Sequence, residues 1–270
     1  MNMDDAVISL KHIKKSYGKN EVLRDVNLEV SKGDIYGLVG RNGSGKTTIF
    51  KILLGLSEFT SGEVHIGAAE DDLETGRSKT GFFVGQNFFG YMTGRENLEY
   101  YRRLKKIRSA GETDRVLKLV GLEAAAGKKV SGYSMGMKQR LGIANALIGN
   151  PEIIILDEPA NGLDPQGIAD IRHLVKKLNE ECGITIIISS HILGELQNTA
   201  NRFGILNEGE IVKVLTQEDL KISTDYVRLN VDDAARAREI LAQNGIKIFS
   251  ESSDSISLED YYFSLVGGVK

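Results

Sequence analysis

The hydrophobic pattern of the chain centres on three short runs of mainly apolar residues. They occupy residues 34–39, 153–156 and 184–189, where apolar positions follow one another without regular alternation with polar ones. A strand that is buried on both faces, as in a parallel sheet covered by helices, has this pattern. The sequence therefore predicts an α/β fold built on buried parallel strands.

Other stretches alternate between apolar and polar positions, which is typical of strands with one buried face. Residues 6–14 alternate in part, and residues 22–30 do so more regularly. We expect these stretches to form two antiparallel strands joined by a turn that carries Tyr17. Further short strands are predicted at residues 61–67 and 82–84, and a hairpin at residues 203–206 and 210–214.

Helical spacing of apolar residues occurs between the strands, beginning at residues 47–54. Thr93 precedes Glu96 by three positions, which is the spacing of a capping box at the start of a helix. Residues 69–79 are charged and irregular, so we expect a surface loop there. Helices are predicted at residues 96–108, 112–120, 168–182 and 195–200, with another from residue 134 or 135 onward.

The pattern divides the chain into a large part and a small one. Residues 1–221 combine strands and helices, and a helical subdomain at about residues 91–150 is inserted in their core. The composition then shifts, and a helix predicted at residues 232–243 is flanked by strand-like stretches. We therefore expect a main domain at residues 1–221 and a small C-terminal accessory β/α unit at residues 222–270.

Composition adds limits to this picture. Hydrophobic residues make up 41% and charged residues 26% of the 270 positions, and the net charge of −3 gives no basic field, so no nucleic acid is expected. A single cysteine, Cys182, excludes an internal disulfide and fits a reducing compartment. The first residues lack the pattern of a signal peptide, and no apolar run approaches the roughly 20 residues that span a bilayer. A membrane role would require a partner.

The most specific motif lies at residues 40–48, where the sequence matches G-x-x-x-x-G-K-[ST] between a predicted buried strand and a predicted helix. Glycines allow backbone N–H groups to converge on a polyphosphate, and the start of a helix favours an anion. Lys46 would reach the outer phosphates and Thr47 would bind Mg²⁺. The sequence therefore predicts a nucleoside triphosphate site. Its candidate residues are Gly40, Asn42, Gly43, Ser44, Gly45, Lys46, Thr47 and Thr48.

Two carboxylates, Asp157 and Glu158, follow the apolar run at residues 153–156. In an open α/β sheet the carboxyl ends of the strands form the ligand-binding edge. Asp157 would hold Mg²⁺ through the water shell of the metal, and Glu158 could accept a proton from an attacking water molecule. Taken alone, the pair would also fit a solvated acidic turn after a strand. The phosphate-loop motif in the same chain argues against that alternative.

Taken in order, the motifs resemble those of ATP-binding-cassette (ABC) ATPases over roughly residues 5–215. Residues 40–48 resemble the Walker A loop, Asp157 and Glu158 the Walker B pair, and Tyr-Ser-Met-Gly-Met-Lys-Gln-Arg at residues 133–140 the family signature. The resemblance implies a P-loop NTPase (RecA-like) core with an antiparallel β subdomain and an inserted helical subdomain. An Asn-Lys-x-Asp guanine motif is absent, which favours ATP over GTP.

The resemblance also assigns roles to isolated residues. Tyr17 is similar to the aromatic residue that stacks on adenine, Gln86 to the glutamine that contacts Mg²⁺ and faces the membrane partner, and Asp164 closes a stretch similar to the D-loop. His191 is similar to the switch histidine that contacts the γ-phosphate. Considered alone, Tyr17 would fit an aromatic residue that only packs, and His191 would fit a structural histidine. The two roles are therefore assigned because of where these residues stand in the family pattern.

The signature departs from the common Leu-Ser-Gly-Gly-Gln form, because Met135 replaces the first glycine and Met137 the glutamine. Ser134 and Gly136 remain, and they supply a hydroxyl and a helix N-terminus for an anion. This variant form resembles the subfamily that drives drug, bacitracin or lantibiotic export with a separate membrane subunit. The accessory region at residues 222–270 also suits that subfamily.

The resemblance implies ATP hydrolysis by in-line attack of water on the γ-phosphate, with Glu158 orienting the water and Lys46 and Mg²⁺ neutralising charge. It further implies a head-to-tail pair of cassettes in which Ser134 and Gly136 of a second copy complete the site. A homodimer is the simplest assembly. The expected location is cytoplasmic, on the inner face of the membrane through an integral membrane permease.

Two other functions stay open. A soluble ABC-type ATPase that is not coupled to transport usually has two cassettes or long coiled-coil insertions, and neither is visible in the sequence. A nucleotide-gated regulatory module would not need Glu158 and His191. The basic stretch at residues 102–108 is read as a solvated helix face, with contact to a membrane partner or to lipid headgroups as the alternative.

Overall fold

The computed structural model of the chain describes residues 6–68, 71–85, 88–221, 231, 233–246 and 248. The chain divides into two compact units, residues 1–222 and 223–270. The first unit contains every named strand and all but one of the named helices of the described residues. The limits proposed for the inserted subdomain and the accessory unit stay predictions.

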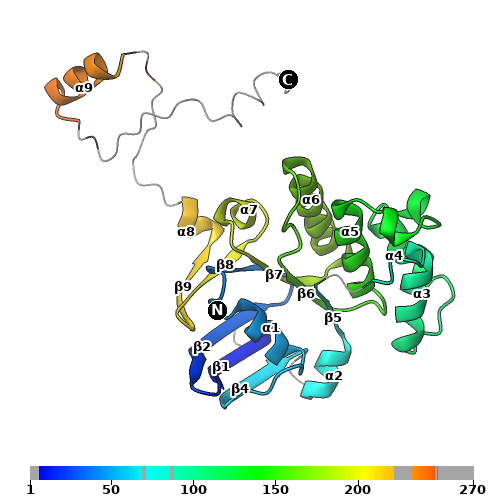
Figure 1. The fold of residues 1–270 in the computed structure, drawn as a ribbon. Helices are drawn as coiled ribbons and strands as arrows, with labels where there is room; N and C mark the ends of the chain where they lie inside the picture. Colours follow the sequence, from blue (N-terminus) through cyan, green and yellow to red (C-terminus); the bar gives the residue numbers. More distant parts are fainter. Residues whose placement is uncertain are drawn as a thin grey trace. The chain divides into compact units, whose positions relative to one another are not determined.

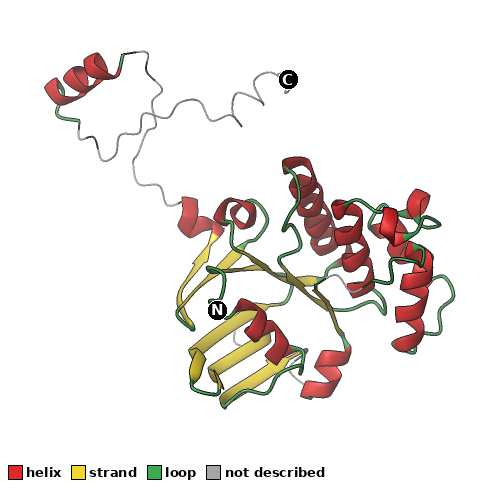
Figure 2. Ribbon diagram, viewed as in Figure 1, coloured by secondary structure: helices red, strands yellow, loops and turns green. Residues whose placement is uncertain are grey.

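A sheet of nine strands forms the frame of the first unit in its described residues, in the order β4-β1-β2-β9-β8-β3-β7-β6-β5 (Figure 2). The central neighbours β3, β7, β6 and β5 are parallel, whereas β1 pairs antiparallel with β2 and β4, and β8 with β9. The strands are β1 (Ala6–Tyr17), β2 (Asn20–Ser31), β3 (Ile35–Val39), β4 (Ser61–Ile66), β5 (Thr80–Val84), β6 (Ile153–Asp157), β7 (Thr185–Ser190), β8 (Arg202–Asn207) and β9 (Glu210–Thr216).

The three apolar runs form β3, β6 and β7, as the sequence predicts, and successive residues face two different cores. In β6, Ile153 and Ile155 pack with one cluster, while Ile154 and Leu156 pack with the other. Because side chains alternate between the two faces of a strand, a sheet that is covered on both faces needs apolar residues at every position. This double burial explains why the runs show no alternation.

Helices cover the two faces of the sheet and form a group at its β5 end (Figure 1). Helix α1 belongs to the core that it shares with β1, β2 and β4, and helices α3 to α6 contribute to the other core. The helices of the first unit are α1 (Lys46–Leu53), α2 (Leu73–Ser78), α3 (Gly94–Leu104), α4 (Glu112–Leu119), α5 (Met135–Ala146), α6 (Pro165–Cys182), α7 (Leu193–Gln197) and α8 (Gln217–Lys221), with short 3-10 turns at Glu123–Ala125 and Val130–Gly132.

The expected loop at residues 69–79 is wrong in part, because α2 occupies Leu73–Ser78. The Asp72 side chain accepts a hydrogen bond from the Thr75 N–H at 2.7 Å, which caps the helix. Gly76 then lies so close to β4 that an added Cβ would be 1.6 Å from the Ile66 carbonyl oxygen. Tertiary contact thus stabilises a helix of six residues that the charged sequence does not indicate.

The other predicted elements of the first unit are found within a few residues of their expected limits. The capping box is confirmed, since Thr93 Oγ1 accepts from the Glu96 N–H at 3.1 Å and Glu96 Oε2 accepts from the Thr93 N–H at 2.8 Å. Helix α6 begins at Pro165, three residues before its predicted start at residue 168, because Asp164 caps it. The predicted hairpin forms as β8 and β9.

The second unit is described at one helix, α9 (Ala234–Gln243), which confirms most of the helix predicted at residues 232–243. Asp233 caps it by accepting from the Arg236 N–H at 2.9 Å. The strand-like stretches predicted around it lie mostly outside the described residues. In the parts of the chain that are described, no helix is both long and apolar enough to cross a membrane.

A close approach at Gly142 places α5 against the sheet. A Cβ added there would lie 2.2 Å from the ring of Phe83, which is 5% exposed in β5. We predict that Gly142→Ala lowers the free energy of unfolding by about 1–3 kcal/mol, because it overpacks this contact. Thermal or urea unfolding measures the loss.

The control is Gly194→Ala in α7, where an added Cβ meets no atom within 4 Å. Alanine there is expected to leave stability unchanged or to raise it by up to about 1 kcal/mol through helix propensity. Equal stability of the two variants would contradict the packing described for Gly142.

Candidate functional site

The phosphate-loop motif connects the end of β3 to the start of α1, as its two flanks predict. Gly43 and Gly45 have φ angles of 81° and 111°, which L-residues with side chains rarely adopt. A Cβ at Gly45 would also lie 2.6 Å from Cδ2 of Leu23 in β2. Both positions therefore require glycine. The loop leads into the N-terminus of α1, where backbone N–H groups have no partner within the helix.

Lys46 is 5% exposed and is surrounded by oxygen atoms. Its Nζ donates to the carbonyl of Gly40 at 2.7 Å and to that of Arg41 at 3.3 Å, and it lies 3.4 Å from Oε1 of Glu158. A buried ammonium needs such partners. The same group can exchange these neutral carbonyls for phosphate oxygens, which carry more charge.

Three hydroxyl and carboxylate groups meet where β6 and β7 end. Thr47 Oγ1 donates to Oδ2 of Asp157 at 2.7 Å, and Ser189 Oγ donates to Oδ1 of the same carboxylate at 2.6 Å. Asp157 and Ser189 are paired in the register of the two parallel strands, so the sheet itself fixes this contact. Hydroxyl and carboxylate oxygens in this arrangement suit Mg²⁺, which binds few protein ligands and keeps several waters.

Within the described residues, no group of three or more His, Cys, Asp or Glu side chains could hold a metal ion.

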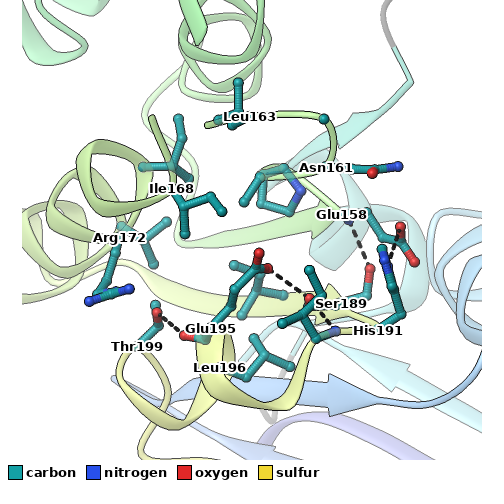
Figure 3. Close-up of a pocket in the computed structure, with 18 residues that line it drawn as sticks. Glu158, Asn161, Leu163, Ile168, Arg172, Ser189, His191, Glu195, Leu196 and Thr199 are labelled. Carbon is teal, nitrogen blue, oxygen red and sulfur yellow. Dashed lines mark hydrogen bonds and ion pairs between the residues drawn. The ribbon is translucent and has the colours of Figure 1, made fainter. Parts of the chain in front are cut away.

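Glu158 has a backbone φ of 49°, a left-handed conformation that is uncommon for a residue with a side chain. Its N–H donates to Ser189 Oγ at 2.9 Å. Its Oε2 lies 3.1 Å from Nδ1 of His191, and the two side chains point toward each other (Figure 3). The conformation of the turn thus directs the Glu158 carboxylate toward both Lys46 and His191.

A pocket continues from Glu158 and His191 between the turn after β6 and helices α6 and α7 (Figure 3). Its walls are mainly apolar and include Leu163, Ile168 and Leu196. The paired carboxylate and imidazole lie at one end of this pocket.

Tyr17 lies at the end of β1, and its side chain is near the start of α1. Its hydroxyl is 3.3 Å from Ser57 Oγ, and this contact, with a smaller effect from Thr48, lowers the pKa of the phenol. Lys15 Nζ lies 4.7 Å from the centre of the ring, within the range of a cation–π contact. Tyr17 is 48% exposed, so a planar ring could reach it.

The remaining predicted residues lie apart from this cluster or outside the description. Ser134 caps α5 by accepting from the Met137 N–H at 3.3 Å, and Asp164 caps α6 by accepting from the Gly167 N–H at 3.0 Å. In the part of the chain that the structure describes, no hydrogen bond or ion pair joins Ser134 or Gly136 to Lys46 or Glu158. Gln86 lies outside the described residues.

Sequence reasoning missed Ser189, which bonds both Asp157 and the backbone of Glu158. Its signal is present but weak: a serine ends an apolar run, as polar residues often do. Only the register of β6 beside β7 shows that this serine meets the Asp157 carboxylate.

The parallel core, the glycine-rich loop at a helix start and the adjoining carboxylates define a P-loop nucleoside triphosphatase. The chain matches the family described as ABC transporter over residues 23–161. It is also 37% identical to the bacitracin transport ATP-binding protein BcrA of Enterococcus faecalis, over 99% of both chains. The chain therefore belongs to the ABC transporter family, and its cassette binds and hydrolyses ATP.

Other relatives support the same family. The lantibiotic transport ATP-binding protein SrtF of Streptococcus pyogenes is 38% identical over 76% of this chain and 89% of its own length. Among solved structures, a dimeric post-hydrolysis state of the ATP-binding cassette MJ0796, bound to ADP and Pi, is 32% identical. Its TM-score is 0.68 over 78% of this chain and 98% of that one.

We predict that Ser189→Ala lowers ATP turnover by about 10–100-fold, the usual effect of removing a group that orients a functional carboxylate. The variant loses the donor to Asp157 and the acceptor for the Glu158 N–H. Steady-state phosphate release measures the change. Ser9→Ala is the control, because Ser9 Oγ is buried and has no partner within the described ranges, so its loss should cost little. Similar rates for Ser189→Ala and Ser9→Ala would contradict the role of Ser189.

Proposed function

We propose that this chain powers the export of a peptide antibiotic or a similar drug through a separate membrane subunit. The observation that carries the proposal is the likeness to a bacitracin transport ATP-binding protein along 99% of both chains. The contacts of Glu158 with Lys46 and His191 support it. The resemblance of the signature form points to the same subfamily. A soluble ABC-type ATPase and a regulatory module that does not hydrolyse ATP are less favoured, since the named relatives are transport proteins.

In the proposed reaction, Glu158 orients a water molecule and accepts its proton as the water attacks the γ-phosphate. Lys46 transfers its hydrogen bonds from the loop carbonyls to phosphate oxygens and stabilises the charge that develops there. His191, 3.1 Å from Glu158, contacts the γ-phosphate and fixes the orientation of the carboxylate. Tyr17 stacks on the adenine.

Thr47 and Asp157 would hold a Mg²⁺ ion, with Gln86 as a further contact in the family pattern. The contact of 2.7 Å between Thr47 Oγ1 and Asp157 Oδ2 supports this assignment, because it brings two oxygen ligands together beside the loop. A bound Mg²⁺ would neutralise charge on the β- and γ-phosphate oxygens.

The proposed assembly is a head-to-tail homodimer with ATP at the interface. Ser134 and Gly136 lie at the N-terminus of α5, where a hydroxyl and the start of a helix can meet an anion. An added Cβ at Gly136 would meet only Leu163 Cδ2, at 3.9 Å, so this surface is open. The dimeric structure of the MJ0796 cassette supports pairing of this kind. Asp164 directly follows Leu163, the residue beside Gly136, and would belong to the same interface.

The proposed contact with the membrane subunit is a group of aromatic rings that follows Gln86. Phe89 and Tyr100 meet edge to face with centroids 5.2 Å apart, and Tyr91 is 69% exposed. Exposed aromatic residues are enriched at protein interfaces. Through this contact the chain would lie on the cytoplasmic face of the membrane, bound to an integral permease.

The basic stretch at residues 102–108 contributes less to such a surface than its sequence suggests. Arg102 is bonded to Glu99 at 2.7 Å, and Arg103 also contacts Glu99, at 2.9 Å. These two guanidinium groups hold the pKa of Glu99 at about 2. Part of the positive charge is therefore neutralised within α3.

We predict that Glu158→Gln lowers ATP turnover by about 10²–10⁴-fold, the usual contribution of a positioned base, while ATP binding persists.

Lys46→Ala should instead weaken ATP binding, because the main cation facing the outer phosphates is lost. Phosphate release and calorimetric titration with ATP separate the two effects. Near-wild-type turnover of Glu158→Gln would remove the residue from this role, and unchanged ATP affinity of Lys46→Ala would argue against the loop as the phosphate site.

The transport role is tested in the native cells. Deleting this chain should raise sensitivity to bacitracin or to a lantibiotic, and wild-type chain should restore resistance while Glu158→Gln should not. Minimal inhibitory concentrations measure the effect, and a tagged chain should copurify with an integral membrane protein. Unchanged sensitivity to both classes of peptide, with no membrane protein bound, would favour a soluble ATPase.

A further inference from the structure

A buried amide links the signature helix to the loop that follows the catalytic strand. Gln139, one turn into α5, is 5% exposed, and its Nε2 donates to the main-chain carbonyl of Asn161 at 3.3 Å. Among the described residues, its Oε1 is buried and has no hydrogen-bond partner. An unsatisfied buried acceptor is costly, whereas a methionine would fill a similar volume without it. Packing alone therefore does not account for an amide at this position.

The bonded carbonyl belongs to the turn that begins at Glu158. The Asn161 N–H donates to the Glu158 carbonyl at 3.1 Å, which closes the turn. Because Glu158 has a φ of 49°, this turn holds the residue in an unfavourable backbone conformation that its surroundings must maintain. Gln139 bonds one end of the turn, and Ser189 bonds the other through the Glu158 N–H.

The next residue of α5, Arg140, makes a second link, to the helix that follows the loop. Arg140 Nη2 donates to Oδ2 of Asp170 in α6 at 2.6 Å. Gln166 also bonds Asp170, at 2.8 Å. Consecutive residues of α5 thus contact the loop itself and the helix that follows it.

We propose that Gln139 is a positioning residue for hydrolysis, which keeps the Glu158 turn in register with the N-terminus of the signature helix. If α5 moved, its hydrogen bond from Gln139 would also move Asn161. The closed turn would then transmit this displacement to the backbone of Glu158. Gln139 touches neither ATP nor water in this role. The inference rests on the proposed role of Glu158 as the base.

The test uses the full-length chain and the variant Gln139→Met, which keeps the size of the side chain and removes its N–H donor. We expect kcat for ATP hydrolysis to fall about tenfold, because small displacements of a reacting group have effects of this size or larger. KM for ATP should stay within about twofold, since the nucleotide-binding loop is not changed. The melting temperature should also hardly change.

The matched control is Asn145→Leu, which removes another amide of α5 whose buried acceptor has no hydrogen-bond partner in the part of the chain that is described. This variant should keep wild-type kcat. An equal loss of kcat in Asn145→Leu and Gln139→Met, or an unchanged kcat in Gln139→Met, would overturn the proposal. Gln139→Glu provides a second variant in case methionine prevents folding: it retains the shape but presents a carboxylate to the Asn161 carbonyl. It should be at least as slow as Gln139→Met, and wild-type turnover would overturn the proposal.

A double-mutant cycle with Glu158→Gln separates positioning from a general structural effect. If Gln139 acts through Glu158, adding Gln139→Met to Glu158→Gln should change single-turnover hydrolysis by less than about twofold. A tenfold loss in both backgrounds would overturn the proposal, because Gln139 would then act independently of Glu158. Wild-type turnover in Glu158→Gln itself would overturn the proposed base as well. Failure of the base is thus distinguished from failure of the Gln139 proposal alone.

Discussion

The parallel register of β3, β7 and β6 is the constraint on which the rest of the site depends. It places the phosphate loop, Ser189 and Asp157 at one edge of the sheet, although they are distant in sequence. From there one continuous set of hydrogen bonds runs from Thr47 through Asp157 and Ser189 to the backbone of Glu158. Each member orients the next, so the phosphate-loop motif and the turn that carries Glu158 form a single unit.

Charged groups lie close together around the Glu158 carboxylate. The buried Lys46 lies between loop carbonyls and Glu158, and His191 lies on the other side of the same carboxylate. A nucleotide would therefore compete for Lys46 with groups of the protein itself. Such competition connects binding of the phosphates to the environment of Glu158, because a cation drawn toward phosphate leaves the carboxylate that it faced.

The second half of the proposed ATP site lies on different elements. Ser134 and Gly136 are held at the start of α5, and α5 is fixed to the sheet where Gly142 lies against Phe83 and to the Glu158 turn through Gln139. The helix that carries Ser134 and Gly136 is thus linked by a hydrogen bond to the turn that carries Glu158. This arrangement is suited to coupling two sites in a dimer.

The sequence by itself determined the elements whose signals are local. Unbroken apolar runs indicated β3, β6 and β7, because strands buried on both faces need apolar residues throughout, and the phosphate loop followed from its glycines, Lys46 and Thr47. It could not indicate α2, whose stability depends on the contact of Gly76 with β4, or the roles of Ser189 and Gln139. Those depend on which strand lies beside which and on how closely a helix approaches a loop. Tertiary structure alone decides such pairings, since a side chain carries no local sign of the distant group that it will bond.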